Sequence, residues 1–426
     1  MKKIHLITLF LIVFTVLGVS TDLGLQLVPQ NVEFLLILKD NSTNYELLKS
    51  VPLARMLLED LGMELFVQQQ LEIYKYSQGI DVDSFYKLFS KNILFYRSPT
   101  EEALIFGPFE DPEKIAQAVK DVLEQFDVEA EFELVDNFLV FSSSRYSKPE
   151  APVDLPQEVK ELLTQKNWMV WYMANGALGK AWGSLKISDD IVMGEGIANI
   201  ENQDILEKLR TARDVKEFAN IKVFKDIVFC STVPDVILEM GDILPLPENV
   251  EEKELKRLKE LNEYFKESVG RYSYASLEMN VEYTEEGEQV IKMRGCAFID
   301  AKMDENKMKE LLEKRGGKII GKYQGKDVYL VGEKEEKSYV MYDTEKSQLI
   351  ISLSPFDETF ATLETSQMKL GDAMKLLSVE GKEFSLVYIN FQDLMEKFLG
   401  YSEESYFILK GYQLEDGKVR MKFILK

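Results

Sequence analysis

The chain has 426 residues and a formal net charge of −22, with 73 acidic residues against 51 basic ones. A surface of this charge repels nucleic acid and anionic lipid, because both are dense in negative charge, and we expect neither as a partner. Hydrophobic residues make up 46% of the chain, which excludes global disorder and allows a large core. The length suggests about two to three domains.

The first twenty residues predict export. Lys2 and Lys3 form a short positive region, and the run Ile4–Val19 is almost wholly apolar. Gly18 and Ser20 are the small residues expected before a cleavage site after Ser20, so residues 1–20 have the layout of a secretory signal peptide. The alternative is a retained anchor, although the apolar run is shorter than the roughly 20 residues that span a bilayer. We expect a mature chain without a transmembrane segment, secreted or held in the periplasm.

The only histidine, His5, lies inside the predicted signal peptide. The mature chain is therefore expected to lack histidine, which excludes Ser–His–Asp and Cys–His catalysis and histidine-ligated metal or haem sites. We expect no cofactor, no metal and no catalytic residue. Abundant lysine and glutamate with few cysteines is a composition reported for thermophile proteins.

One unit recurs along the chain: a strand, an Asp or Asn cap, and an amphipathic helix. In one copy, the predicted strand Leu104–Phe109 leads through Asp111 and Pro112 into a helix over Ile115–Phe126. Asp111 can accept hydrogen bonds from the unpaired N–H groups of the first turn, and proline suits the first helical position. The other copies, in the order strand, cap and helix, are Gly295–Ala301, Asp304 and Lys307–Lys314, and more weakly Gly196–Ile200, Asn202 and Ile205–Arg210.

Each clear copy is followed by a turn that enters an apolar strand ending in serine, Val135–Ser142 in the first and Tyr342–Ser352 in the second. These shared elements predict a tandem duplication. The first α+β module is expected to cover residues 21–222 and the second residues 223–426. Further strand-to-helix steps are predicted at Glu33–Ser42, Trp168–Trp182, Ile227–Met240 and Phe384–Leu399.

Hairpin signals at Glu286-Gly287, Gln324-Gly325 and Asp416-Gly417 indicate antiparallel neighbours. A long charged helix is predicted over Val250–Val269. Because hairpins alternate with helices, the sequence predicts an α+β fold of mainly antiparallel sheets, with helices on one face, rather than a doubly wound parallel sheet.

The order of these elements resembles the bacterial exported family known as domain of unknown function 3352. The resemblance covers most of residues 25–145 and, more loosely, 225–400. It implies an exported protein, and it implies no reaction, cofactor or catalytic residue. The motifs that carry it are Leu27-Val28-Pro29 before Phe34–Leu38, Gly79–Asp83 before Ile93–Tyr96, the helix start Asp111–Lys114, and the strand Val135–Ser142.

Two patterns of oxygen-bearing residues suggest chemistry but have simpler explanations. Asp40, Ser42 and Asn44 mimic the first ligands of a calcium loop, but Tyr45 replaces the required glycine and Val51 the closing glutamate, so helix capping is the better explanation. Adjacent acids could supply the carboxylates of a hydrolase, yet such pairs arise by chance among 73 acidic residues. These pairs are Glu101-Glu102, Asp189-Asp190, Glu251-Glu252 and Glu403-Glu404.

The two cysteines, Cys230 and Cys296, lie in predicted strands with apolar neighbours. An oxidising compartment permits a disulfide between them. We expect two separate buried thiols instead, because free cysteine packs as a small hydrophobic residue.

The three tryptophans, Trp168, Trp171 and Trp182, all fall in one short segment. Trp168 and Trp171 differ by an odd number, so a regular strand places them on opposite faces. Core packing explains such residues, and the alternative is a contact site for a partner, a glycan or an apolar ligand. They are the candidate contact residues of the chain.

These observations predict an exported envelope protein that binds or scaffolds an unidentified partner or ligand without catalysis. One alternative is a hydrolase that uses carboxylates or a Ser–Lys pair. Another is a carrier of an apolar ligand held between sheet and helices. Convergent buried acids in a cleft would favour the hydrolase, and a large apolar cavity would favour the carrier.

Overall fold

The structure is a computed structural model that describes residues 23–79, 81–125, 131–176, 179–234, 236, 269–283, 289–314, 316–332, 337–414 and 417–426. The predicted signal peptide, the predicted charged helix up to residue 268, the Glu286-Gly287 turn and Asp416 lie outside the described residues. The chain forms two compact units. The first runs up to Asn199 and includes Leu425 and Lys426, and the second runs from Ile200 to Ile424.

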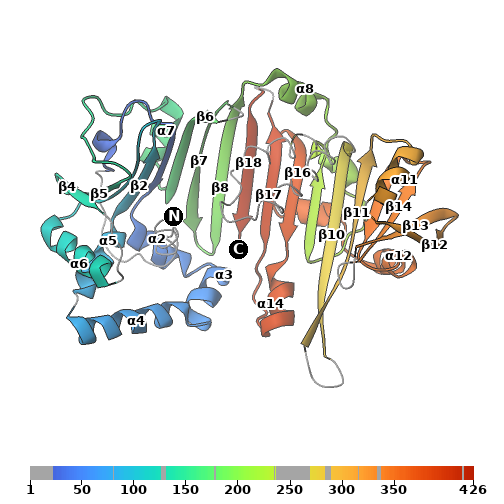
Figure 1. Cartoon of the computed structure of the whole chain (residues 1–426), viewed down its shortest axis with the longest axis horizontal. Coiled ribbons are helices and arrows are strands. Elements are labelled where there is room, and N and C mark those ends of the chain that lie inside the picture. The colour runs from blue at the N-terminus through green and yellow to red at the C-terminus, as the bar shows by residue number, and fades with distance from the viewer. Residues whose placement is uncertain are drawn as a thin grey trace. The chain divides into compact units, whose positions relative to one another are not determined.

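The first unit is an antiparallel sheet with strand order β4-β5-β3-β2-β1-β6-β7, and β8 lies beside β7 (Figure 1). Its strands are β1 (Phe34–Leu38), β2 (Asn92–Arg97), β3 (Glu102–Gly107), β4 (Phe132–Val135), β5 (Phe138–Ser142), β6 (Met169–Gly176), β7 (Gly179–Ser188) and β8 (Ile191–Ile200). Its helical segments are η1 (Leu25–Leu27), α2 (Asn41–Leu48), α3 (Pro52–Arg55), η2 (Met56–Asp60), α4 (Met63–Gln78), α5 (Val82–Ser90), α6 (Pro112–Gln125) and α7 (Gln157–Thr164).

Helices cover both faces of this sheet. On one face, Leu94 and Tyr96 share a core with Val159 of α7. On the other, Ile93 and Phe106 pack with Phe85 of α5 and with α6. Neighbouring residues of a strand point to opposite faces, so the two cores lie on opposite sides. The predicted α+β fold with antiparallel sheets is confirmed, but helices lie on both faces rather than one, because the inner strands are apolar on both sides.

The second unit has strand order β12-β13-β14-β15-β11-β10-β9-β16-β17, again antiparallel, with β18 beside β17 (Figure 1). Its strands are β9 (Ile227–Ser231), β10 (Val269–Tyr283), β11 (Gln289–Ala301), β12 (Lys318–Tyr323), β13 (Lys326–Val331), β14 (Ser338–Asp343), β15 (Gln348–Ser352), β16 (Lys382–Ile389), β17 (Phe407–Gln413) and β18 (Val419–Leu425). Its helical segments are α8 (Gln203–Thr211), η3 (Val215–Phe218), α11 (Glu305–Lys314), α12 (Phe356–Thr365), α13 (Leu370–Lys375) and α14 (Phe391–Leu399).

The strand order β4-β5-β3-β2-β1-β6-β7 of the first unit matches β14-β15-β11-β10-β9-β16-β17 of the second. The central strand is paired on both edges in each unit: its middle residue, Leu36 in β1, lies between Phe95 and Trp171, and the middle residue of β9, Phe229, lies between Ala275 and Val387. Helices α6 and α11 follow equivalent strands, and the serine-ending strands β5 and β15 take equivalent places. The tandem duplication predicted from the sequence stays a prediction, with which this shared strand order is consistent. In the described part of the chain, the β12–β13 hairpin has no counterpart in the first unit.

Most of the predicted caps are present. Asp111 Oδ1 accepts the Lys114 N–H at 3.2 Å, and Asp304 Oδ1 accepts the Lys307 N–H at 2.9 Å. Asn202 caps α8 through the Asp204 and Ile205 N–H groups. At Asp40 the prediction is wrong: this residue has a φ of 46° and its side chain does not cap α2.

Three further expectations meet the structure at particular places. The strand-to-helix step predicted at Trp168–Trp182 is instead the hairpin of β6 and β7, because Gly176 pairs with Gly179 across the reversal. The step predicted at Phe384–Leu399 is present as β16 and α14. The sequence placed the division between the two modules after residue 222, whereas the two compact units divide at Asn199. Val215 and Phe218 accordingly pack in a core of the second unit.

Cys230 and Cys296 are free and buried, as expected. Burial raises the pKa of each thiol to about 12, so neither is a reactive thiolate at neutral pH. Within the described ranges, no helix has both the length and the apolar composition to cross a bilayer.

Candidate functional site

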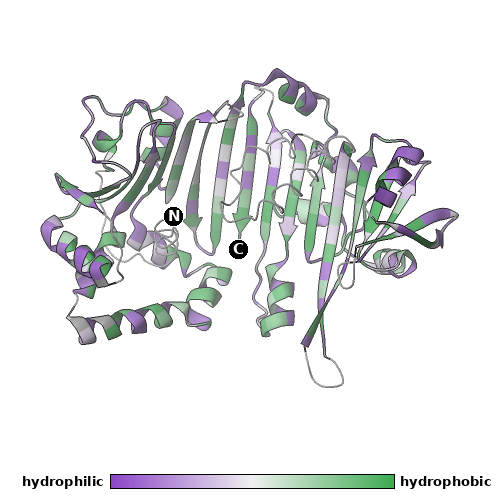
Figure 2. Ribbon diagram, viewed as in Figure 1, coloured by the Kyte–Doolittle hydropathy of each residue, from purple (hydrophilic) through white to green (hydrophobic). Residues whose placement is uncertain are grey.

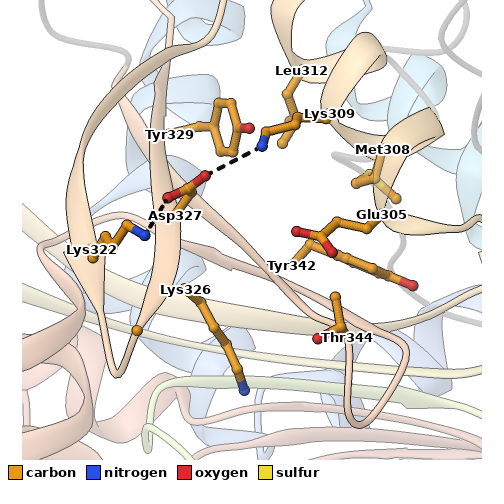
Figure 3. Close-up of a pocket in the computed structure, with 11 residues that line it drawn as sticks. Glu305, Met308, Lys309, Leu312, Lys322, Lys326, Asp327, Tyr329, Tyr342 and Thr344 are labelled. Atoms are coloured by element: carbon orange, nitrogen blue, oxygen red, sulfur yellow. Dashed lines mark ion pairs between the residues drawn. The ribbon is translucent and has the colours of Figure 1, made fainter.

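A pocket of about 190 Å³ lies between α11 and the β12–β13 hairpin (Figure 3). The hairpin turns at Gln324 and Gly325, whose φ angles of 50° and 82° are those of the tight turn that the sequence predicts there. Figure 2 shows hydrophilic residues on α11 and toward the tip of this hairpin. The pocket is therefore a polar site formed where α11 meets the β12–β13 hairpin, the element without a counterpart among the described residues of the first unit.

Apolar contacts fix the walls of the pocket. Met308 and Leu312 of α11 are buried against Tyr329 of β13, Val340 of β14 and Leu349 of β15. The two α11 residues are four apart, so they lie on one face of the helix and hold it on the sheet. The remaining residues of α11 that line the pocket, Glu305 and Lys309, then flank its opening.

The lysines of the pocket differ in how fully they are neutralised. Lys326 makes a tight ion pair with Asp343 at 2.7 Å. Lys309 and Lys322 share the single carboxylate of Asp327 at 3.4 Å and 3.6 Å (Figure 3). These two distances exceed the roughly 2.7–2.9 Å of a good charge-assisted hydrogen bond. One carboxylate therefore balances two ammonium groups, and it does so loosely.

Tyr329 is the most unusual residue in the pocket. It is only 3% exposed, and its hydroxyl has no hydrogen-bond partner in the described part of the chain. Burial raises its pKa, so the group is a neutral hydroxyl at physiological pH. By contrast, the hydroxyl of Tyr342 in the same pocket donates to the Met303 carbonyl at 2.7 Å. A buried hydroxyl without a partner costs about 1–3 kcal/mol, so a ligand that supplied an acceptor to it would be stabilised.

The three predicted tryptophans do not form one contact surface. Trp182 is 7% exposed in a core of the first unit, paired with Tyr172. Trp168 is half-buried and donates its indole N–H to Asn41 Oδ1 at 2.9 Å. The half-buried Trp171 points to the other face, where its ring lies over Gly183 and Gly196. Packing against named neighbours accounts for all three positions.

The adjacent acids are not brought together as a catalytic pair where the structure shows their contacts. Glu101 accepts hydrogen bonds from Tyr96 and Ser142, at 2.9 Å and 2.6 Å, whereas Glu102 pairs with Arg97. Within the described residues, no group of three or more His, Cys, Asp or Glu side chains could hold a metal ion.

Sequence reasoning missed a buried ionic cluster in the second unit. Asp226 is wholly buried, and its Oδ2 accepts from Lys397 at 2.8 Å and from the Met279 N–H at 2.7 Å. Lys397 also contacts Asp393 at 2.6 Å, and Lys225 contacts Asp393 at 2.7 Å. The Asp393/Lys397 spacing is visible as an i,i+4 pair, but the contact with Asp226 depends on the fold. Neither acid lines the pocket under α11. Because Asp226 lies just before β9 and contacts both Lys397 of α14 and Met279 of β10, the cluster holds α14 against these two strands.

Comparison with protein-family models, with curated proteins and with solved structures finds no match for this chain. The resemblance noted from the sequence thus adds no residue to the site. The arrangement under α11 can bind a small polar molecule, because it combines a neutral buried hydroxyl with ammonium and carboxylate groups at one opening.

The Asp226 carboxyl is expected to make stability depend on pH. Burial, and then the neighbouring Asp393, raise its pKa from 3.8 to about 6, so the folded chain holds this proton more tightly than the unfolded chain. The contribution of this group to the free energy of unfolding is therefore greatest below about pH 4 and is lost as the pH rises through about 6.

Substitution of Asp226 by Asn removes this titration and keeps an oxygen for the Met279 N–H. In urea unfolding between pH 4 and pH 8, Asp226→Asn should show a flatter pH dependence than the natural chain and greater relative stability at the alkaline end. Asp357→Asn, at an exposed position, is the control and should follow the natural chain. Parallel curves for Asp226→Asn and the natural chain would show that Asp226 does not titrate in this range.

Proposed function

We propose that this chain is an exported cell-envelope protein that binds a small polar ligand in the pocket under α11 without chemical turnover. The observation that carries the proposal is the buried, unpartnered hydroxyl of Tyr329 beside the loosely neutralised Lys309. Export rests on Lys2, Lys3 and the apolar run that follows them. Binding without turnover is favoured because the only histidine, the commonest general acid–base, lies in the predicted signal peptide.

The volume of the pocket limits the ligand. At about 190 Å³ it is smaller than the roughly 300–1,000 Å³ typical of sites for drug-sized molecules. A molecule the size of an amino acid or a short carboxylic acid is therefore favoured over a cofactor or an oligosaccharide. The residues that approach it come from a helix and a hairpin of one unit, so ligand binding should stabilise that unit.

Filling the pocket tests the proposal. Thr344 is exposed at its edge, so Thr344→Trp should occupy the space without disturbing the buried wall. A thermal-shift screen of amino acids, amines, carboxylic acids and sugars should find ligands that raise the melting temperature of the natural chain and of the Thr344→Ser control. The same ligands should leave Thr344→Trp unchanged. If every stabilising ligand acts equally on Thr344→Trp, the pocket is not the binding site.

A second function, carriage of an apolar ligand, is favoured by a hollow of about 220 Å³ on the sheet of the second unit. Small residues, Ala275, Ala297 and Gly295, form its floor, and larger ones, Phe229 and Leu353 among them, form its sides. In the first unit the positions that pair like Ala275 and Ala297 hold Phe95 and Leu104, which are large. The hollow thus results from side-chain size on a shared backbone, and at this volume it suits a short aliphatic chain.

Ala275→Phe places in the second unit the residue type found at the corresponding position of the first. Octanoate, a short aliphatic acid, should bind the natural chain and the Ala275→Ser control, and should bind Ala275→Phe about tenfold or more weakly, the effect of losing roughly 1.4 kcal/mol. Equal fatty-acid titrations of all three proteins would remove the carrier from consideration.

A further inference from the structure

We infer that the ligand of the pocket under α11 is a short molecule with a carboxylate at one end and an amine at the other. This inference rests on the proposed binding function. It adds the chemical class of the ligand, which follows from the different groups at the two ends of the pocket. The pairing of charges, the buried hydroxyl and the position of Glu305 each contribute one step.

The basic end belongs to the hairpin and to the middle of α11. Lys322 and Asp327 are cross-strand partners in β12 and β13, and Lys309 approaches Asp327 from α11 (Figure 3). Asp327 lies 3.4 Å or more from the ammonium groups of Lys309 and Lys322. A carboxylate of the ligand can therefore form ion pairs with these lysines without breaking a tight ion pair. Lys326 is different, since its 2.7 Å pair with Asp343 is already complete.

Tyr329 supplies the donor that makes this end specific for an acid. Its hydroxyl lies beside the Lys309 ammonium in Figure 3, and it is buried without a partner. A neutral hydroxyl next to an ammonium group is oriented to donate to an anion, because the lysine offers it no acceptor. A ligand carboxylate at Lys309 would accept this hydrogen bond and satisfy the buried group.

The acidic end lies across the pocket. Glu305, at the first turn of α11, makes no ion pair among the described residues, and it lines the pocket together with Tyr342 and Thr344 (Figure 3). A carboxylate without an ion-pair partner at a pocket opening is a suitable site for a protonated amine, because it can accept the hydrogen bonds of the ammonium group. The two ends of the pocket therefore favour ligand groups of opposite charge, a carboxylate at Lys309 and an amine at Glu305.

Three matched probes separate these contributions. 4-Aminobutanoate carries both groups, butanoate only the acid, and butylamine only the amine. Isothermal titration of the full natural chain should rank 4-aminobutanoate first, about tenfold or more ahead of either partial probe, because each partial probe lacks the charged hydrogen bonds of one end. Inorganic phosphate should bind more weakly than 4-aminobutanoate, because it lacks the amine.

Two substitutions assign the ends. Tyr329→Phe should weaken 4-aminobutanoate and butanoate about tenfold and leave butylamine unchanged. Glu305→Gln should weaken 4-aminobutanoate and butylamine and leave butanoate unchanged. Lys314→Met, on the exposed side of α11 outside the pocket, is the control and should bind all probes as the natural chain does.

The ligand class is wrong if phosphate or a partial probe binds as tightly as 4-aminobutanoate, or if Tyr329→Phe and Glu305→Gln weaken all probes alike. Failure of the ligand class is distinct from failure of the binding function. If the screen finds ligands that Thr344→Trp blocks but that carry neither acid nor amine, the pocket is a binding site for another class. If Thr344→Trp blocks no ligand, the binding function itself is lost.

Discussion

The hydrogen bonding of two short apolar strands, β1 and β9, determines how each unit is built. β1 pairs with β2 on one edge and with β6 on the other, and β9 pairs with β10 and β16 in the same way. A strand paired on both edges and apolar on both faces has to be covered on both sides, because exposed apolar area is costly. This requirement explains why helices pack on both faces of the first unit, and why the cores on either side of the sheet are separate.

The candidate site depends on the β12–β13 hairpin, which the second unit has in addition to the strand order that the two units share. Both units have a helix after their third strand, α6 in the first and α11 in the second. Among the described residues, only the second unit has a further hairpin, β12–β13, at the edge of its sheet. The hairpin brings Lys322 and Asp327 beneath α11, which supplies Lys309 and Glu305. If the units arose by duplication, the pocket is a feature acquired by one copy, in the region where an edge strand can be added without disturbing the core.

Local signals in the sequence predicted much of the frame. The caps at Asp111 and Asp304 and the turn at Gln324-Gly325 depend on residues a few positions apart, and all three are present. The pocket was not predicted, because Lys309, Asp327 and Tyr329 are brought together only by the packing of α11 on the sheet. The tryptophans were predicted as contact residues because they are close in sequence. In the structure, Trp182 packs in a core, whereas Trp171 lies over glycines on the opposite face of the sheet. Chain proximity is a weak guide to a site when strands alternate their faces.

The most direct test of the central claim is to identify what the protein carries when it is purified from the cells that make it. The natural chain and Thr344→Trp, each purified gently from such cells, can be compared by mass spectrometry under non-denaturing conditions. The account predicts that the natural chain retains a small adduct that acid releases as a molecule with both a carboxylate and an amine, and that Thr344→Trp lacks it. The same adduct on both proteins, at the same occupancy, would contradict the assignment of the pocket under α11.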